Sequence, residues 1–174
     1  QKGFDLIAYM MPELMREDLQ IVVLGTGEHQ YQSMFNYYDS NFSDKVSARI
    51  TFNASLAQQI YAASDMFLMP SAFEPCGLGQ LIALRYGSIP IVRETGGLKD
   101  TVNPYNEYIG SGNGFGFKNY NSEELLNMIK YALWIYKDKK KWNNLVINAM
   151  NSDNSWGRSA QIYLDMYREL TGQY

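Results

Sequence analysis

The sequence alternates short apolar segments with single helix-like segments over most of its length. Apolar runs of this kind, bounded by turn residues, are typical of strands buried on both faces, and a single crossover helix is the usual way to bring the next strand in parallel. We expect strands at 21–24, 48–52, 66–69, 89–92 and 114–117. The pattern therefore predicts an α/β fold with a doubly wound, Rossmann-like parallel sheet.

Helix signals lie before, between and after these strands. Pro12 should kink or restart a first helix over about 4–15, because a prolyl ring removes a backbone donor. Ser55 is the expected N-cap of a helix that ends at Ala63, and Asn121 with Glu124 resembles a capping box. Further helices are expected over about 28–40 and 78–86, with a loop at 96–97, a surface loop at 103–113 and a helical C-terminal segment over about 121–174.

Composition limits the function classes. With 174 residues, 46% of them hydrophobic and 14% aromatic, the chain can bury the core of one domain. Its 15 basic and 18 acidic residues give no electrostatic reason to bind nucleic acid or an anionic membrane. Cys76 has no second cysteine to pair with, and no apolar run approaches the length of a membrane span, so we expect a cytoplasmic protein with a neutral or small-molecule partner.

The loop over 70–80 is the strongest functional candidate. Ligands in doubly wound sheets bind beyond the carboxyl ends of the strands, and this loop leaves a strand and opens directly into a helix. A helix N-terminus offers unpaired N–H groups, and Gly77 and Gly79 let a phosphate approach closely, which predicts a diphosphate site. Pro75 favours an extended Glu74 that projects toward whatever the diphosphate carries. The alternative is an ordinary helix-start carboxylate with turn-forming glycines.

Two motifs carry a family resemblance. The segment FEPCGLGQ at 73–80 and the segment ETGGLKDTV at 94–102, joined by a helix and a strand, resemble glycogen and starch synthases in residues and spacing. The resemblance implies a retaining GT-B type glycosyltransferase that moves glucose from ADP-glucose to the non-reducing end of an α-1,4-glucan. It implies that residues 1–174 are the C-terminal, nucleotide-sugar-binding domain, that an N-terminal acceptor domain lies outside the chain, and that the chain alone is inactive.

The same resemblance assigns roles to residues. It implies that Glu74 contacts the donor glucose and stabilises positive charge at the anomeric carbon, as nucleophile or as electrostatic partner. Lys2, within Gln1-Lys2-Gly3, is expected to grip the distal phosphate. The remaining expected donor-site residues are Phe52 against the adenine, Cys76 as lining, the backbone of Gly77, Leu78 and Gly79 at the phosphates, Thr95, Gly96 and Gly97 at the cleft, and Gly27 as a secondary contact.

Some of these assignments keep a structural alternative. Phe52 can stack on a base but could instead be a buried core residue, and Thr95–Gly97 could be a plain tight turn. Lys137–Lys141, flanked by Trp134 and Trp142, could contact polysaccharide, although packing is the favoured interpretation.

Other activities are disfavoured. The third glycine of a dinucleotide fingerprint after Gly25 and Gly27 is replaced by Gln30, so NAD binding is not expected. With one cysteine and one histidine, His29, the chain lacks the spacing of a zinc site, and we expect no metal and no cofactor.

Two alternative functions stay open. One is a related transferase that uses UDP-glucose. Many such relatives carry a second glutamate eight positions after the first, whereas Ile82 stands there in this sequence. The other is a noncatalytic nucleotide-binding module, which the presence of Lys2, Glu74 and the glycines disfavours.

Overall fold

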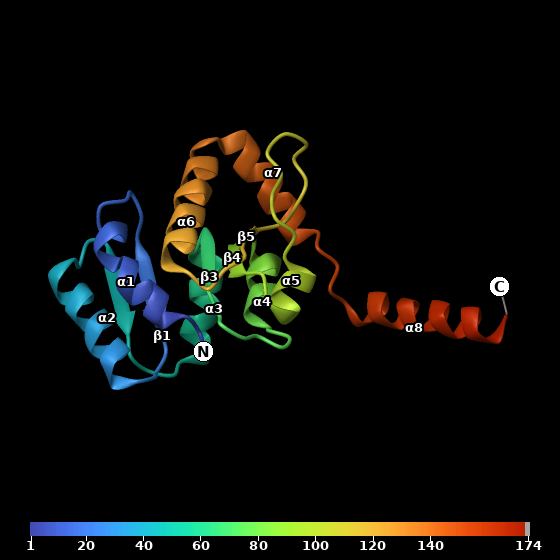
Figure 1. Cartoon of the computed structure of the whole chain (residues 1–174), viewed down its shortest axis with the longest axis horizontal. Helices are drawn as coiled ribbons and strands as arrows, with labels where there is room; N and C mark the ends of the chain where they lie inside the picture. The colour runs from blue at the N-terminus through green and yellow to red at the C-terminus, as the bar shows by residue number, and fades with distance from the viewer. Residues whose placement is uncertain (173–174) are drawn as a thin grey trace.

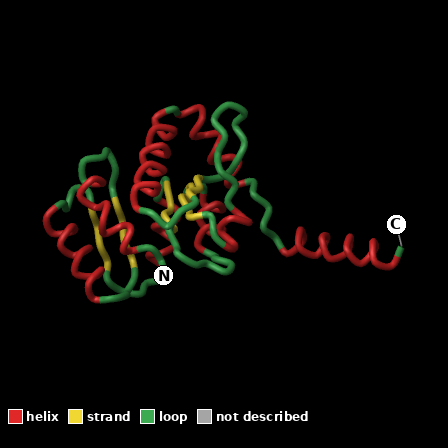
Figure 2. The backbone as a smooth tube through the Cα atoms, viewed as in Figure 1, coloured by secondary structure: helices red, strands yellow, loops and turns green. Residues whose placement is uncertain are grey.

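Within residues 1–172, five parallel strands form the centre of the fold, in two separate sheets. In the computed structural model, which describes residues 1–172, β1 (Ile21–Leu24) pairs with β2 (Val46–Arg49). The second sheet has the order β3 (Met66–Met69), β4 (Ile89–Arg93) and β5 (Phe115–Phe117). Figure 2 shows the two groups of strands side by side. The predicted α/β fold with parallel strands is confirmed, and the strands are divided between two sheets.

Helices surround both sheets. In Figure 1, α1 and α2 lie beside the first sheet, and α6 stands between them and α7. Helix α6 packs against α1, β5 and α7, whereas α4 packs against β3, β4 and α7. The helices are α1 (Phe4–Leu14), α2 (His29–Asn41), α3 (Ala54–Ala63), α4 (Gly79–Tyr86), α5 (Gly96–Thr101), α6 (Ser122–Lys137), α7 (Lys139–Met150) and α8 (Trp156–Thr171).

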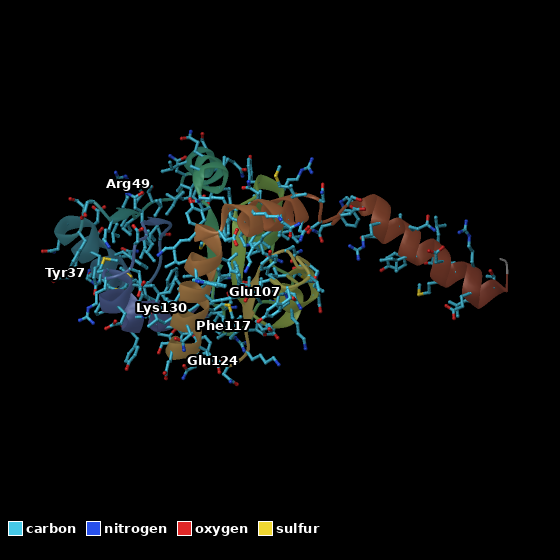
Figure 3. The ribbon with its side chains drawn as sticks, turned by 90° about the horizontal axis from the view of Figure 1, so that it is seen from above. Tyr37, Arg49, Glu107, Phe117, Glu124 and Lys130 are labelled. Atoms are coloured by element: carbon cyan, nitrogen blue, oxygen red, sulfur yellow. The ribbon has the colours of Figure 1, made fainter. Side chains whose placement is uncertain are left out.

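One hydrophobic core joins the two sheets. It contains Met11 of α1, Val46 of β2, Phe115 of β5 and Leu125 of α6, each at most 2% exposed. Burying a side chain of this size stabilises the fold by about 1.5–3 kcal/mol. At its edge Lys130 of α6, labelled in Figure 3, forms a 3.1 Å ion pair with Glu17, in the segment that follows α1. Helices α1 and α6 therefore connect the half of the fold that holds the first sheet to the half that holds the second.

The second strand lies earlier than the sequence predicts. We expected 48–52, but β2 spans Val46–Arg49, because its partner β1 ends at Leu24, which is in register with Arg49. Thr51 then donates a 2.9 Å backbone hydrogen bond to the Arg49 carbonyl and turns the chain out of the sheet. Hydrophobicity alone did not show where the partner strand stops.

The expected cap at Ser55 is also wrong. The N-cap of α3 is Asn53, whose Oδ1 accepts a 2.9 Å hydrogen bond from the Leu56 amide. Asparagine and serine are similarly good caps, so the choice depends on where the strand before the helix ends. Because β2 ends early, the chain is free to begin the helix at Ala54.

Three further segments differ locally from the predicted pattern. Helix α1 continues through Pro12 to Leu14 without a break. The segment expected as a loop at 96–97 begins the short helix α5. Asn121 caps α6 as expected, but Glu124 accepts its hydrogen bonds from Asn119, so the reciprocal half of the capping box does not form.

Helix α8 extends away from the rest of the molecule (Figure 1). Ser155 caps it with a 3.3 Å bond from the Arg158 amide, and none of its residues is buried. Within residues 1–172, no helix combines the length and apolarity needed to cross a bilayer.

Candidate functional site

The Glu74 carboxylate contacts Lys2, which lies 72 positions earlier in the sequence. Glu74 is 8% exposed, in the loop that follows β3. Its Oε2 accepts a 2.6 Å charge-assisted hydrogen bond from Lys2 Nζ and a 3.3 Å hydrogen bond from Ser71 Oγ. The Lys2 side chain is 55% exposed. The structure thus brings together the two residues expected to be catalytic, with the carboxylate held in the fold and the ammonium group facing solvent.

The segment that carries Lys2 is fastened to the same loop. The Gln1 carbonyl accepts a 2.9 Å hydrogen bond from the Ala72 amide. Gly3, the N-cap of α1, has a φ of 81° and lies directly against the carbonyl of Pro70, where a Cβ atom would overlap it. A side chain at this position is excluded both by the left-handed backbone and by the contact.

The loop at 76–79 leads into α4, which begins at Gly79. Cys76 and Leu78 are exposed, and Leu78 is 72% exposed. The first N–H groups of a helix have no intrahelical partner and carry a partial positive charge. The segment expected to bind phosphate therefore lies at the N-terminus of α4, with Cys76 and Leu78 exposed.

Local backbone conformation and packing also explain why Gly77 and Gly79 are glycines. Gly77 has a φ of 73°. A Cβ atom at Gly79 would lie 3.0 Å from the Phe67 ring and 3.3 Å from the Tyr61 hydroxyl, and burial raises the pKa of that phenol. The turn-forming explanation therefore accounts for their conformation and packing, while phosphate binding stays a prediction.

Gln80 closes the loop from inside, and the sequence did not indicate it. The side chain is fully buried, and its Nε2 donates to the carbonyls of Cys76 and Gly77, each at 3.0 Å, and to Thr101 Oγ1 at 3.2 Å. One amide group thus joins the loop at 76–79 to α5. A glutamine directly after the glycine-rich turn was the available signal in the sequence.

Gly96 and Gly97 support the loop that carries Glu74. The Gly97 amide donates to the carbonyls of Glu74 and Pro75, at 3.2 and 3.1 Å. A Cβ atom on Gly96 would overlap the Glu74 carbonyl. Thr95 is the N-cap of α5 and makes no side-chain cap bond. The predicted element is therefore part of the site, as the surface on which residues 74–76 rest, and the start of a helix instead of a plain turn.

In the part of the chain that the structure describes, Phe52 and Gly27 form no hydrogen bond with Lys2 or Glu74. Phe52 is 88% exposed, so the buried-core alternative for it is wrong. Gly27 is exposed, and a Cβ atom there would meet nothing within 4 Å. Both follow the carboxyl ends of the first sheet, which is where a donor base is expected.

Arg93, at the carboxyl end of β4, is the other residue that sequence reasoning missed. Its Nε donates a 2.8 Å hydrogen bond to the carbonyl of Ser71. An arginine that ends an otherwise apolar strand was the signal that could have identified it.

The remaining candidates lie outside this region. Trp142 is 5% exposed, which confirms packing there, whereas Trp134 is 54% exposed and contacts Lys141 at 4.9 Å from the ring centroid. His29 is exposed. A hollow of about 840 Å³ lies between the 103–113 loop and the end of α7, and none of its lining residues is an expected site residue. No cluster of three or more metal-ligating side chains occurs within residues 1–172.

Comparisons with known proteins identify relatives of this chain. Two curated glycogen synthases are similar over nearly the whole chain: that of Clostridioides difficile is 76% identical over 170 residues, and that of Clostridium beijerinckii 69% over 173. The matches cover 98% and 99% of this chain but 35% and 36% of those proteins. The chain thus spans about a third of the length of these relatives.

Solved structures are similar as well. The catalytic domain of starch synthase IV from Arabidopsis thaliana, bound to ADP and acarbose, superposes with a TM-score of 0.84 and 38% identity, covering 97% of this chain and 36% of that one. Sucrose-phosphate synthase from Thermosynechococcus elongatus shares the fold, with a TM-score of 0.66 and 21% identity over 99% of this chain and 43% of that one. The model of the family described as glycosyl transferases group 1 matches residues 1–150, and the chain belongs to this family of glycosyltransferases.

Proposed function

We propose that this chain is the donor-binding domain of an ADP-glucose-dependent glycogen or starch synthase. The observation that carries the proposal is the 2.6 Å Lys2–Glu74 pair, whose carboxylate lies in the loop that leads into α4. The similarity to curated glycogen synthases, and to a starch synthase bound to ADP, supports the choice of nucleotide and polymer.

The charges of Lys2 and Glu74 suit different parts of the donor. A diphosphate needs positive charge and N–H donors, which Lys2 and the backbone of 77–79 would supply together. Glu74 would face the glucose that the diphosphate carries. In the transfer, the bond between the anomeric carbon and the phosphate oxygen breaks and the acceptor hydroxyl oxygen bonds to that carbon on the same face. ADP leaves with the electron pair of the broken bond and takes up the proton of the acceptor hydroxyl.

The carboxylate and the cations would then act at opposite ends of the breaking bond. Glu74 would stabilise the positive charge that develops at the anomeric carbon, and Lys2 with the helix N–H groups would stabilise the negative charge on the departing diphosphate. Neither end needs a metal ion in this scheme. A metal-free reaction in the cytoplasm is therefore part of our proposal, and we expect glucose transfer by the full-length enzyme to be unchanged in excess chelator.

Calorimetry on the chain tests donor binding. We expect ADP to bind more tightly than UDP, and Lys2→Ala to weaken ADP binding by about tenfold, because one charge-assisted contact to phosphate is lost. Lys140→Ala, at an exposed lysine of α7, is the matched control and should leave the affinity unchanged. Equal affinities of the wild type and the Lys2→Ala variant would contradict the phosphate role.

A chimera tests the reaction. This chain can replace the matching 170 residues of the Clostridioides difficile protein, to which it is 76% identical. We expect the chimera to incorporate glucose into glycogen from ADP-glucose, and the same chimera with Glu74→Gln to lose at least about a hundredfold in rate. Incorporation from UDP-glucose alone would favour the related UDP-sugar enzymes, and a chimera that binds ADP without transfer would favour a noncatalytic module.

A further inference from the structure

Arg93 fastens the loop of Glu74 to the end of β5. Its guanidinium donates to three backbone carbonyls: Ser71 at 2.8 Å, Ala72, and Lys118 at 3.4 Å. The planar fork of an arginine reaches several acceptors in fixed directions, whereas a lysine offers a single nitrogen. The contact therefore depends on the shape of the side chain as well as on its charge.

The same guanidinium also reaches the first helix through Tyr120. Its central carbon lies 5.8 Å from the centroid of the Tyr120 ring, in a cation–π arrangement. The Tyr120 hydroxyl donates a 2.5 Å hydrogen bond to Asp5 Oδ1, in the first turn of α1. Asp5 stands three residues after Lys2. Arg93 is thus connected to both segments that form the ion pair.

Two of the three residues whose carbonyls Arg93 binds also contact the ion pair or the segment that carries Lys2. Ser71 gives its hydroxyl to Glu74, and Ala72 gives its amide to the Gln1 carbonyl. We infer that Arg93 is a positioning residue, which acts through Ser71, Ala72 and Tyr120 to set where Lys2 stands relative to Glu74. Its consequence for nucleotide affinity rests on the proposed function, whereas its effect on the junction between the two segments does not.

Arg93→Lys is the informative variant, because it keeps the positive charge and removes the fork. Amide hydrogen exchange, followed by NMR on the chain without ligand, reports the junction directly. We expect the Ala72 amide, which bonds to Gln1, to exchange at least about tenfold faster, while the amides of α6 keep their rates. Arg85→Lys, at an exposed arginine of α4 with no role in the network, should change neither.

Binding provides a second readout that general destabilisation would not mimic. Arg93→Lys should weaken ADP by about tenfold and leave AMP, which lacks the distal phosphate, unchanged. In a double-mutant cycle with Lys2→Ala, Arg93→Lys should cause no further loss, because both act through the same contact. Tyr120→Phe, which keeps the ring and removes the bond to Asp5, should show a smaller loss of the same kind and serves if the Arg93 variant does not fold.

Each outcome decides. The positioning role would be overturned if Arg93→Lys changed the exchange rates of the Ala72 amide and the α6 amides equally. Equal losses of affinity for ADP and AMP, or additive losses of affinity in the double-mutant cycle, would overturn it as well. If the wild-type chain binds no ADP, the proposed function fails, and the exchange rate of the Ala72 amide alone decides whether Arg93 holds the junction.

Discussion

Gly97 lies so close to Cys76 that a Cβ atom on Gly97 would overlap the carbonyl oxygen of Cys76. Gly97 is buried, and the neighbour is backbone, which cannot rotate away as a side chain can. The contact makes the glycine at the start of α5 a requirement of the loop that carries Glu74.

Gly97→Ala should therefore destabilise the chain by about 1–3 kcal/mol, as overpacking of an interior contact does. The free energy of unfolding in urea measures the change. Gly157→Ala is the matched control, because Gly157 is exposed in α8 and an added Cβ would meet only Ser155 Oγ at 3.5 Å. We expect the control to be neutral or slightly stabilising. Equal effects of the two substitutions would show that the close contact at Gly97 costs nothing.

Tyr120 should make stability depend on alkaline pH. Burial, together with the hydrogen bond to Asp5, raises the pKa of its phenol to about 12 from an ordinary value of 10.0. A pKa raised in the folded state stabilises the protein fully below the unfolded value and loses that contribution as pH rises through the folded value. The contribution should therefore be complete below pH 10 and disappear toward pH 12.

Tyr120→Phe removes this group, so the difference in unfolding free energy between wild type and variant should shrink as pH rises from 9 toward 12. Denaturation in urea at several pH values measures it. Tyr163→Phe, on the exposed helix α8, controls for general alkaline effects. A difference that stays constant over the whole range is the result that would contradict this prediction.

Asn53→Ala and Ser55→Ala distinguish the two candidate caps of α3. Asn53 Oδ1 accepts the Leu56 amide in the structure, so its loss should cost about 1 kcal/mol. Ser55 is exposed within the helix, and its replacement should change the unfolding free energy by less than about 0.5 kcal/mol. Thermal and urea unfolding of both variants give the comparison. A larger loss at Ser55 would restore the cap expected from the sequence.

Two tryptophans test the distribution of packing energy. Trp142 is 5% exposed and stands edge-on to Tyr136, whereas Trp156 is 90% exposed at the start of α8. In this chain Trp142→Ala should cost about 3–5 kcal/mol, and Trp156→Ala should be nearly neutral. Chemical denaturation measures both, and a substantial loss at Trp156 would mean that α8 packs on the body of the chain in solution.

The strands were predictable where the apolar run and the strand coincide, as at Ile21–Leu24 and Met66–Met69. They were not where the apolar pattern continues past the partner. Alternate apolar residues run on from Val46 to Phe52, but pairing stops at Arg49 because β1 stops. Strand pairing depends on both segments, so the composition of one segment does not show where the pairing ends.

The site divides in the same way. Lys2 and Glu74 were identified because their surroundings form a recognisable motif. Arg93 was missed because its importance lies in carbonyl groups far away in the sequence, such as that of Ser71. Gln80 stands inside the 73–80 motif, but its bonds to the nearby carbonyls of Cys76 and Gly77 and to the Thr101 hydroxyl appear only in the folded chain. A backbone acceptor has no residue type, so no motif records it. The short helix α5 was missed because two glycines at its start are unfavourable for a helix by propensity.

The bifurcated bond from the Gly97 amide has one more consequence. It fixes the backbone of Glu74 itself, so the carboxylate can reorient only by rotation about its own side-chain bonds. The entropy of ordering this residue is thus lost when the chain folds and is not lost again when a ligand arrives. The group that must still adapt is the exposed Lys2, whose ammonium can leave one carboxylate oxygen for an incoming anion. Glu74 is thus a negative charge on a fixed backbone, and Lys2 is a counterion that can move.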